Sequence, residues 1–520
     1  MFILDMVHHN PGEPRYQSAF NDPAKIASMG YNGKVYSLFE SPILAVDWNT
    51  VLPGTMAGEA EEWRQELFSR IKGEFARCKA HHLQVLAMSD LVLLPRSLVE
   101  KDGMLDRFGN VGEEWVQKHL RLLFNLVFTQ FPELDGLVVR IGETYLNDAP
   151  YHVGKIDRKN DPSGTIIPLI NLLREELCVK RNKTLVFRTW GAFDENLTVY
   201  KWIADSIEPH PRLVIAVKHC EEDFHRGNPF SKIIGFGNHR QLIEVQCARE
   251  YEGKGAYPNY LAHGIIDGFE EHFRSRSLRS VGEFVRRCPE KFAGIWTWSR
   301  GGGWEGPYIK NELWPDINAW ILAQWCADPS VSEERLFADY CRKFLEYDED
   351  QTAAFRRLCL MSEKAIVRGK ASLIGFFPPW WSRDQYIGLP PRTPYDTEEL
   401  LAEKHESVRL WSEMLEISRT LGGYVETSTR YGWDIYRIYE AVWNVTLGNN
   451  SPGWHRQYED AWEDLEKLAE THPDCATLYE RTVIRRLDAT GSADSMMETC
   501  SRRISGDHYR DHLKKAGSDE

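Results

Sequence analysis

The most constraining feature of this sequence is an alternation, over its first two thirds, of short apolar runs with longer amphipathic segments. The short runs are rich in β-branched and aromatic residues, and the longer ones repeat apolar residues every three or four positions. Such an alternation is typical of an α/β fold in which helices connect parallel strands. The predicted strands are 2–7, 34–39, 83–88, 136–141, 184–189, 212–218, 241–246 and 292–298.

Eight strands separated by helices are the number needed to close a (β/α)8 TIM barrel, which we expect over residues 1–326. Beyond residue 326 the apolar residues repeat with the period of a helix, which predicts an all-helical C-terminal domain over 327–505. The polar composition that follows predicts a tail over 506–520. The clearest helices are predicted at 59–79, 113–130 and 166–179 in the barrel, and at 332–370, 396–421, 431–448, 454–471 and 474–489 beyond it.

Composition and charge exclude several classes of protein. The formal net charge is −14, whereas binding to a phosphate backbone needs a basic surface, so we expect no nucleic-acid partner. No run of about 18 uncharged apolar residues occurs, so we expect no membrane span. The N-terminus lacks the pattern of a signal peptide, and the ten cysteines show no pairing rhythm. These features favour a cytoplasmic location, although a leader trimmed from the chain would leave no trace.

The sequence also indicates neither a metal nor a cofactor. His8-His9 and His81-His82 are adjacent pairs, and neighbours on a strand face opposite sides, so they do not build a metal site. The glycine run 301–303 lacks the lysine and hydroxyl residue of a phosphate-binding loop. No Gly-x-Ser-x-Gly segment is present to carry a serine nucleophile.

Carboxylates lie in or just after three of the predicted strands, as Glu143, Asp223 and Glu244. Active sites of TIM barrels lie at the carboxyl ends of the strands, and glycosidic cleavage needs an acid and a base on opposite faces of the sugar. We therefore take these three residues as candidate catalytic groups. Glu143 could instead pair with Arg140 in a structural ion pair, and Asp223 belongs to an acidic run that would suit a solvated surface. Glu244 lies within an apolar strand, where a buried carboxylate needs a reason.

Cations and aromatic residues accompany these acids. Arg140, Arg188 and Lys218 lie at the ends of three strands and could converge on a carboxylate, which points to a uronic acid as substrate. They could equally neutralise the neighbouring acids. The candidate sugar-stacking residues, which could also be core or interface aromatics, are Tyr145, Trp190, Trp298 and Trp304.

The motifs of the sixth and seventh strands resemble the α-glucuronidases of glycoside hydrolase family 67, which remove glucuronic acid from xylan fragments. The family motif Lys-Asn-Gly-Pro-Ile-Asp-Phe is similar to residues 218–224, where Lys218, Asp223 and Phe224 keep its spacing. Its Glu-Phe-Gln followed by Gln-Glu-Tyr-Leu-Gly is similar to residues 244–246 and 249–253.

The resemblance implies that Asp223 and Glu244 activate the attacking water and that Glu143 protonates the leaving oxygen. It also implies that Arg140, Arg188 and Lys218 bind the uronate carboxylate. The segment Val138-Val139-Arg140-Ile141-Gly142-Glu143 is one residue shorter between cation and acid than in the family. The family usually carries a β-rich domain before the barrel, which the sequence as given lacks, since its first predicted strand begins at residue 2.

The sequence thus predicts an exo-acting, inverting glycosidase that removes a terminal glucuronate or 4-O-methylglucuronate from a xylan-type oligosaccharide. Its alternatives are a glycosidase of the same barrel type for another sugar, a carbohydrate-binding relative without catalysis, and a uronate lyase. The C-terminal domain could line the site or build a homodimer. The aromatic loop 375–381 could reach the barrel mouth or form an interface.

Overall fold

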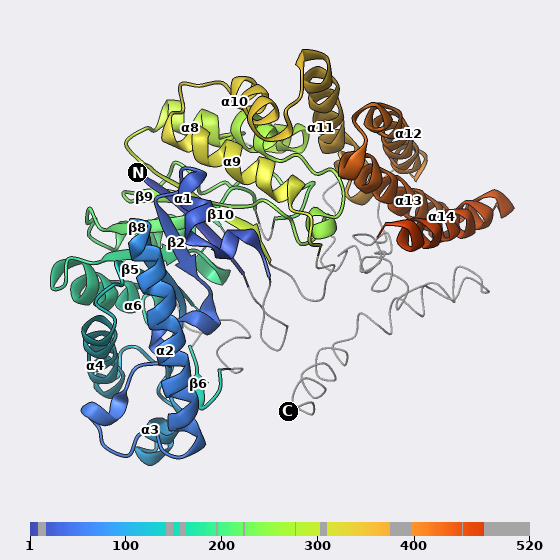
Figure 1. The fold of residues 1–520 in the computed structure, drawn as a ribbon. Coiled ribbons are helices and arrows are strands. Elements are labelled where there is room, and N and C mark those ends of the chain that lie inside the picture. The colour runs from blue at the N-terminus through green and yellow to red at the C-terminus, as the bar shows by residue number, and fades with distance from the viewer. Residues whose placement is uncertain are drawn as a thin grey trace.

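The centre of the protein is a closed barrel of eight parallel strands, in the order β1-β10-β9-β8-β7-β5-β3-β2 (Figure 1). The computed structural model describes residues 1–8, 17–141, 149–156, 162–193, 196–221, 224–275, 277–301, 309–374, 397–449 and 451–472. The barrel strands are β1 (Phe2–Val7), β2 (Gly33–Tyr36), β3 (Gln84–Leu91), β5 (Gly136–Ile141), β7 (Thr184–Arg188), β8 (Leu213–Lys218), β9 (Arg240–Gln246) and β10 (Phe292–Arg300). The predicted (β/α)8 barrel and all eight of its strands are confirmed.

Helices cover the outside of the barrel, with α2 lying along the wall in Figure 1. They are α1 (Pro23–Ser28), α2 (Glu59–Ala80), α3 (Arg96–Lys101), α4 (Glu114–Gln130), α6 (Ile166–Leu173), α7 (Leu197–Asp205), α8 (Val281–Arg287) and α9 (Leu313–Ala327). The expectation of a helix between every pair of strands is wrong at one place, because the described residues between β8 and β9 form turns. Gly227, Gly235 and Gly237 adopt positive φ there, and a right-handed helix cannot include that conformation.

Two short strands were not predicted. β4 (Leu93–Pro95) and β6 (His152–Gly154) pair antiparallel in a separate two-stranded sheet. Each strand belongs to a segment that follows the carboxyl end of a barrel strand, β3 in one case and β5 in the other. The pairing therefore links two loops at the end of the barrel where the active sites of this fold lie.

The chain beyond α9 is helical, as predicted. Its helices are α10 (Glu333–Tyr340), α11 (Glu349–Lys370), α12 (Thr397–Leu421), α13 (Gly423–Thr446) and α14 (Pro452–Thr471). The single helix expected over 332–370 is divided, because Glu346 has φ 56° and the side chain of Asp348 begins α11 as a capping box. The predicted helix 474–489, the aromatic loop 375–381 and the tail 506–520 lie outside the described residues. The domain boundary at residue 326 stays a prediction.

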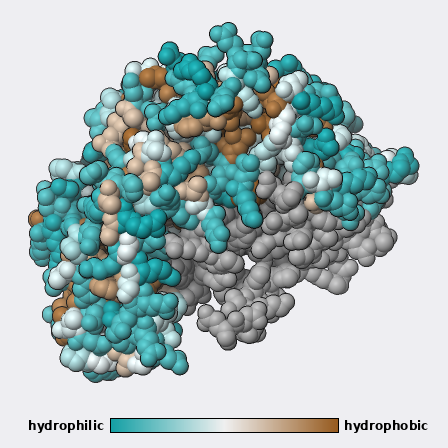
Figure 2. Space-filling view, in the orientation of Figure 1, coloured by the Kyte–Doolittle hydropathy of each residue, from teal (hydrophilic) through white to brown (hydrophobic). Residues whose placement is uncertain are grey.

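The C-terminal helices pack on the barrel through aromatic side chains. Trp314 of α9 donates its indole N–H to Ser428 Oγ on α13 at 3.2 Å, and the hydroxyls of Tyr257 and Tyr436 lie 3.3 Å apart. In Figure 1 helices α12 to α14 lie on the opposite side of the molecule from α3 and α4. The face in Figure 2 is mainly hydrophilic, with hydrophobic residues gathered toward its upper part. Within the described residues, no helix is long and apolar enough to cross a membrane.

The interior of the barrel changes from apolar to charged toward the carboxyl ends of the strands. Leu86, Met88, Val138, Val186, Val214, Ala216 and Leu242 are among the buried residues that fill the interior. Side chains alternate along a strand, so the residue two positions further on faces the same way. On five strands that residue is charged, as Asp90, Arg140, Arg188, Lys218 and Glu244. A charged layer therefore lies on top of the apolar interior.

The barrel is closed between β1 and β10, where a fully buried carboxylate joins the two strands. Asp5 Oδ1 accepts from Thr297 Oγ1 at 2.6 Å and from the Ser299 backbone N–H at 3.1 Å, and Oδ2 accepts from Ser299 Oγ at 2.8 Å. Burial nevertheless raises the pKa of Asp5 to about 6, because these hydrogen bonds and Lys34 offset only part of the desolvation.

Asp5 should make stability depend on pH. The folded state holds the Asp5 proton more tightly than the unfolded state, so this stabilisation is complete below pH 4 and is lost as the pH rises through about 6. A shift of this size corresponds to about 3 kcal/mol in total, of which roughly half falls between pH 5 and 7.5. Urea unfolding at both pH values should show a smaller pH effect in Asp5→Asn. An unchanged difference between the two pH values would contradict the assignment.

Candidate active site

A buried ion pair spans the top of the barrel interior. Arg188 at the end of β7 donates from Nε to Glu244 Oε2 at 2.7 Å and from Nη2 to Oε1 at 2.6 Å. Strand β8 lies between β7 and β9, the strand that carries Glu244. The residue of β8 beside Arg188 is Ala216, whose small side chain leaves room for Arg188 to reach Glu244. Arg188 is 2% exposed and Glu244 is 0% exposed, so both charges are removed from water. These two parallel hydrogen bonds, which we call the Arg188 fork, fix the plane of the Glu244 carboxylate.

A second buried pair lies on the neighbouring strands. Arg140 of β5 donates from Nε to Asp90 Oδ1 at 2.6 Å and from Nη2 to Oδ2 at 3.2 Å. Asp90 belongs to β3, directly opposite Arg140 in the strand register. Arg140 thus pairs with Asp90, whereas the ion pair considered for Arg140 with Glu143 stays a prediction, because Glu143 lies outside the described residues.

The three predicted cations meet at one indole. Lys218 Nζ lies 4.0 Å from the centre of the Trp190 ring, and the guanidinium carbons of Arg188 and Arg140 lie 5.0 and 5.2 Å from it. Trp190 is half-buried and follows β7. The negative face of an indole attracts cations, so Trp190 helps to hold three positive charges close together without neutralising them.

Trp298 forms a further wall of the same layer. It lies on β10, and its ring centre is 5.2 Å from the Arg188 guanidinium carbon. His8 stacks on Trp298 with ring centres 4.7 Å apart, and Phe224 lies 6.1 Å away. Phe224 also lies 5.4 Å from Lys218 Nζ, so aromatic rings contact both ends of the cation cluster.

The described charged groups of this layer carry a net positive charge. Arg140, Arg188 and Lys218 face the carboxylates of Asp90 and Glu244, which leaves a formal charge of +1 among these described groups. Nη1 of Arg188 is buried and has no hydrogen-bond partner among the described residues. A buried guanidinium donor without a partner is costly, so this N–H is suited to meet an oxygen of a ligand or a water molecule.

A neutral histidine contacts the backbone of Glu244. The His219 backbone N–H donates to the Glu244 carbonyl oxygen at 3.1 Å, and His219 Nδ1 lies 3.4 Å from the same atom. Arg249 Nη2 donates to His219 Nε2 at 2.6 Å, which places the ring proton on Nδ1. Burial, and then the charge of Arg249, holds the pKa of His219 well below its usual value. His219 therefore stays neutral and ties the backbone of β8 to that of β9.

The structure brings together six of the ten predicted site residues, Arg140, Arg188, Trp190, Lys218, Glu244 and Trp298. The other four lie outside the described residues, and they are Glu143, Tyr145, Asp223 and Trp304. The roles of all ten stay predictions.

Asp90 and His8 also belong to this layer, although neither is among the predicted site residues. The strand expected over 83–88 ended too early to include Asp90, although the alternation of Leu86, Met88 and Asp90 carried the signal. His8 was considered only as a metal ligand. Within the described residues, no three His, Cys, Asp or Glu side chains are grouped to hold a metal ion.

The fold and the site define a TIM-barrel protein with a charged, tryptophan-lined layer at the carboxyl ends of its strands. No protein-family model and no curated protein matches the sequence. A solved GH138 enzyme targeting pectin rhamnogalacturonan II is similar, with a TM-score of 0.51 and 12% identity over 91% of this chain. The match covers 63% of that enzyme, so this chain spans less than two thirds of its length.

Two further solved structures are similar at lower scores. The protein CpGH84B gives a TM-score of 0.44 at 10% identity, covering 96% of this chain and 77% of its own. A mutant O-GlcNAc hydrolase of Thermobaculum terrenum gives 0.42 at 10% identity, covering 99% of this chain and 96% of its own. At 12% identity, the likeness to the GH138 enzyme concerns the fold alone.

Proposed function

We propose that this protein is a glycoside hydrolase that removes a terminal uronic acid, glucuronate or 4-O-methylglucuronate, from xylan-type oligosaccharides. The observation that carries the proposal is the gathering of Glu244, three cations and two tryptophans in one buried layer at the catalytic end of a TIM barrel. Carboxylates beside indoles suit a sugar ring, and a cluster of cations suits a sugar that carries a carboxylate. The similarity of fold to a GH138 enzyme and the motifs shared with family 67 point to the same reaction class.

The proposed mechanism assigns each carboxylate one task. Glu143 protonates the leaving oxygen, while Asp223 and Glu244 activate a water molecule on the other face of the sugar. The Arg188 fork occupies one lone pair on each Glu244 oxygen, so a lone pair remains to accept a proton from water. The acid and base carboxyl groups must stand about 6.5–9.5 Å apart to admit that water molecule. Direct attack by the water then inverts the configuration at the anomeric carbon.

The substrate carboxylate meets the cation cluster in this mechanism. Nη1 of Arg188 lacks a partner among the described residues, and the guanidinium carbon lies 5.0 Å from the Trp190 ring and 5.2 Å from the Trp298 ring, so we assign Nη1 to a carboxylate oxygen of the sugar. Lys218 and Arg140 supply the rest of the positive charge around Trp190. The developing charge on the sugar ring in the transition state is positive, and Glu244 and Asp223 face it as anions.

One observation favours a second candidate, a glycosidase for a neutral sugar. Arg140 and Arg188 each make a bidentate ion pair, with Asp90 and Glu244 respectively. Under this alternative the two arginines serve only to hold the carboxylates. A neutral glycoside and the matching glucuronide should then be cleaved at comparable rates, whereas the uronate proposal expects the glucuronide to be preferred.

A proton NMR time course tests the proposed reaction. The substrate is a xylo-oligosaccharide that carries an α-1,2-linked glucuronate, and the matched control is the same oligosaccharide with α-1,2-linked glucose. We expect β-glucuronate to appear before the α anomer, no release from the glucose analogue, and no release by Glu143→Ala. Appearance of the α anomer first would contradict inversion, and equal cleavage of both substrates would support the neutral-sugar alternative. An unsaturated product that absorbs in the near ultraviolet would instead indicate a lyase.

A further inference from the structure

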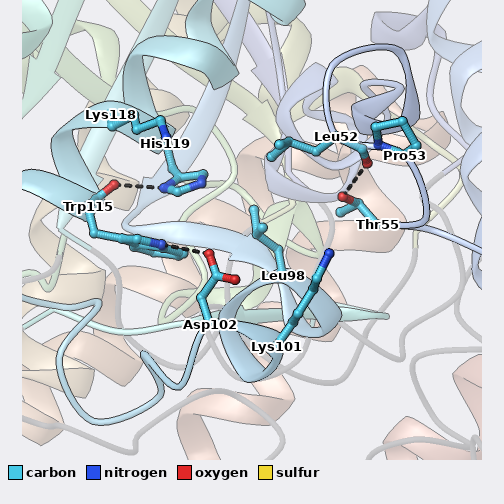
Figure 3. A pocket seen from close by; sticks show the side chains of 9 residues that line it. All are labelled: Leu52, Pro53, Thr55, Leu98, Lys101, Asp102, Trp115, Lys118 and His119. Carbon is cyan, nitrogen blue, oxygen red and sulfur yellow. Dashed lines mark hydrogen bonds between the residues drawn. The ribbon is translucent and has the colours of Figure 1, made fainter.

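A separate cavity of about 240 Å³ lies outside the barrel wall, between α3, the first turns of α4 and the segment after the short helix η4 (Trp48–Thr50) (Figure 3). The η4 segment follows β2, and α3 follows β3 and β4. A chain that leaves a parallel strand does so at its carboxyl end, so the cavity lies at the same end of the barrel as the candidate active site. None of its lining residues belongs to that site. We call it the α3–α4 pocket.

One wall of the α3–α4 pocket is made of two adjacent rings that are tilted by 37° to each other. Trp115 and His119 have ring centres 3.9 Å apart, and the Trp115 indole N–H donates to Asp102 Oδ2 at 2.9 Å. Figure 3 shows these rings facing Leu98 and Leu52 across the space. The wall and its opposite side therefore offer flat and apolar surfaces, with polar atoms at their edges.

The histidine of this wall presents a hydrogen-bond acceptor. His119 Nδ1 lies 2.8 Å from the Trp115 carbonyl oxygen, and a carbonyl only accepts, so Nδ1 carries the ring proton. Burial lowers the pKa of His119, which keeps the ring neutral and leaves a lone pair on Nε2. A ligand hydroxyl can donate to this nitrogen.

The charge of the pocket is opposite to that of the whole chain. Lys101 and Lys118 line it together with Asp102, which gives a local formal charge of +1 in a protein whose net charge is −14. Neither ammonium group forms an ion pair with a described carboxylate. Two ammonium groups beside one carboxylate attract a monoanion.

We propose that the α3–α4 pocket binds one uronate unit of an acidic glycan. Lys101 and Lys118 would bind its carboxylate, Asp102 and Nε2 of His119 would accept from its hydroxyls, and its ring would pack against the Trp115 wall. The volume lies below the roughly 300–1,000 Å³ of drug-sized sites, which fits a single ring. The choice of an acidic sugar rests on the proposed function. A second contact on one glycan would raise its effective concentration at the barrel mouth.

Indole resonances report on binding in this pocket directly. The full-length protein is labelled with ¹⁵N at the tryptophan indoles, and the Trp115 signal is assigned with Trp115→Phe. Asp102→Asn provides a second assignment, because it removes the charged acceptor of that indole N–H. Titration with sodium D-glucuronate should move the Trp115 signal to saturation, and D-glucose should leave it in place.

Charge reversal tests which groups recognise the anion. Lys101→Glu/Lys118→Glu should weaken the glucuronate effect on Trp115 at least about tenfold, since each ammonium contact to a carboxylate contributes on the order of 1.4 kcal/mol or more. Lys343→Glu/Lys364→Glu changes the net charge equally at exposed positions on other elements and should have no effect. Equal shifts with glucose, an unchanged affinity in the pocket variant, or competition by inorganic phosphate at equal strength would each overturn the proposal.

The outcome can be separated from that of the proposed function. Hydrolysis of a small glucuronide is measured on the same samples, and Lys101 and Lys118 take no part in the catalytic layer. A Trp115 response without hydrolysis would support the pocket and reject the proposed reaction. Hydrolysis with an unresponsive Trp115 signal would reject the pocket alone.

Discussion

Glu244→Gln is expected to lower the turnover of the glucuronide substrate by about 10²–10⁴-fold, the usual contribution of a positioned general base. Glutamine keeps the size of the side chain and one acceptor oxygen for the Arg188 fork, but it cannot take a proton from water. The KM should change much less than kcat, because the cations assigned to the substrate carboxylate stay in place. Steady-state kinetics on protein whose near-ultraviolet circular dichroism is native gives both quantities.

A buried glutamate away from the site provides the matched control. Glu363 on α11 is also buried and hydrogen bonded, to His263 and to the Gly264 backbone N–H. Glu363→Gln should therefore cost stability without lowering the kcat of the folded protein. An equal loss of kcat in both variants would mean that the Glu244 effect is structural, and the assignment of Glu244 as a base would be wrong.

The largest expected change in stability comes from Arg226→Met. Arg226 donates from Nε to Glu271 Oε1 at 2.5 Å and from Nη2 to Oε2 at 3.0 Å, and both side chains are 1% exposed. Burial alone would raise the pKa of Glu271, but the charge and hydrogen bonds of Arg226 outweigh burial and hold it at about 2. Loss of the arginine leaves a buried carboxylate unpaired, which costs about 3–5 kcal/mol. Urea unfolding followed by circular dichroism measures this loss.

The double variant Arg226→Met/Glu271→Met separates the charge effect from packing. Replacement of both partners by apolar side chains of similar size is often close to neutral, so most of the lost stability should return. A double variant as unstable as Arg226→Met would show that the loss came from packing rather than from the uncompensated charge. The pair ties the segment after β8 to the short helix η9 (Glu270–Arg274), so the single variant should also weaken the support of the candidate site.

The sequence alone predicted the barrel because local patterns encode it. Each strand is a short apolar run, each is bounded by turn residues, and eight such runs meet the number at which this sheet closes. The same patterns wrongly predicted a helix in two places. One is the segment of turns between β8 and β9, and the other is the break before α11. There the left-handed conformations of Gly227, Gly235 and Glu346 end or prevent a helix, and periodicity does not report them.

The cations and aromatics of the candidate site were also predictable in part. Arg140, Arg188 and Lys218 end apolar runs, and the carboxyl ends of barrel strands all meet at one end of the fold. Position in the sequence therefore sufficed to predict that they converge. It did not predict their partners, because an ion pair depends on which side chains face inward at the same height.

The sequence by itself determined the order and approximate position of the eight barrel strands and the presence of charged groups at their ends. Only the tertiary structure decided that Arg188 pairs with Glu244, 56 residues away, and Arg140 with Asp90, 50 residues away. Closure of the barrel sets the register between strands, and the small Ala216 leaves Arg188 room to cross β8. The three cations share Trp190 because β5, β7 and β8 lie side by side in the barrel and Trp190 follows the middle one of these strands, an arrangement that depends on how the folded strands pair.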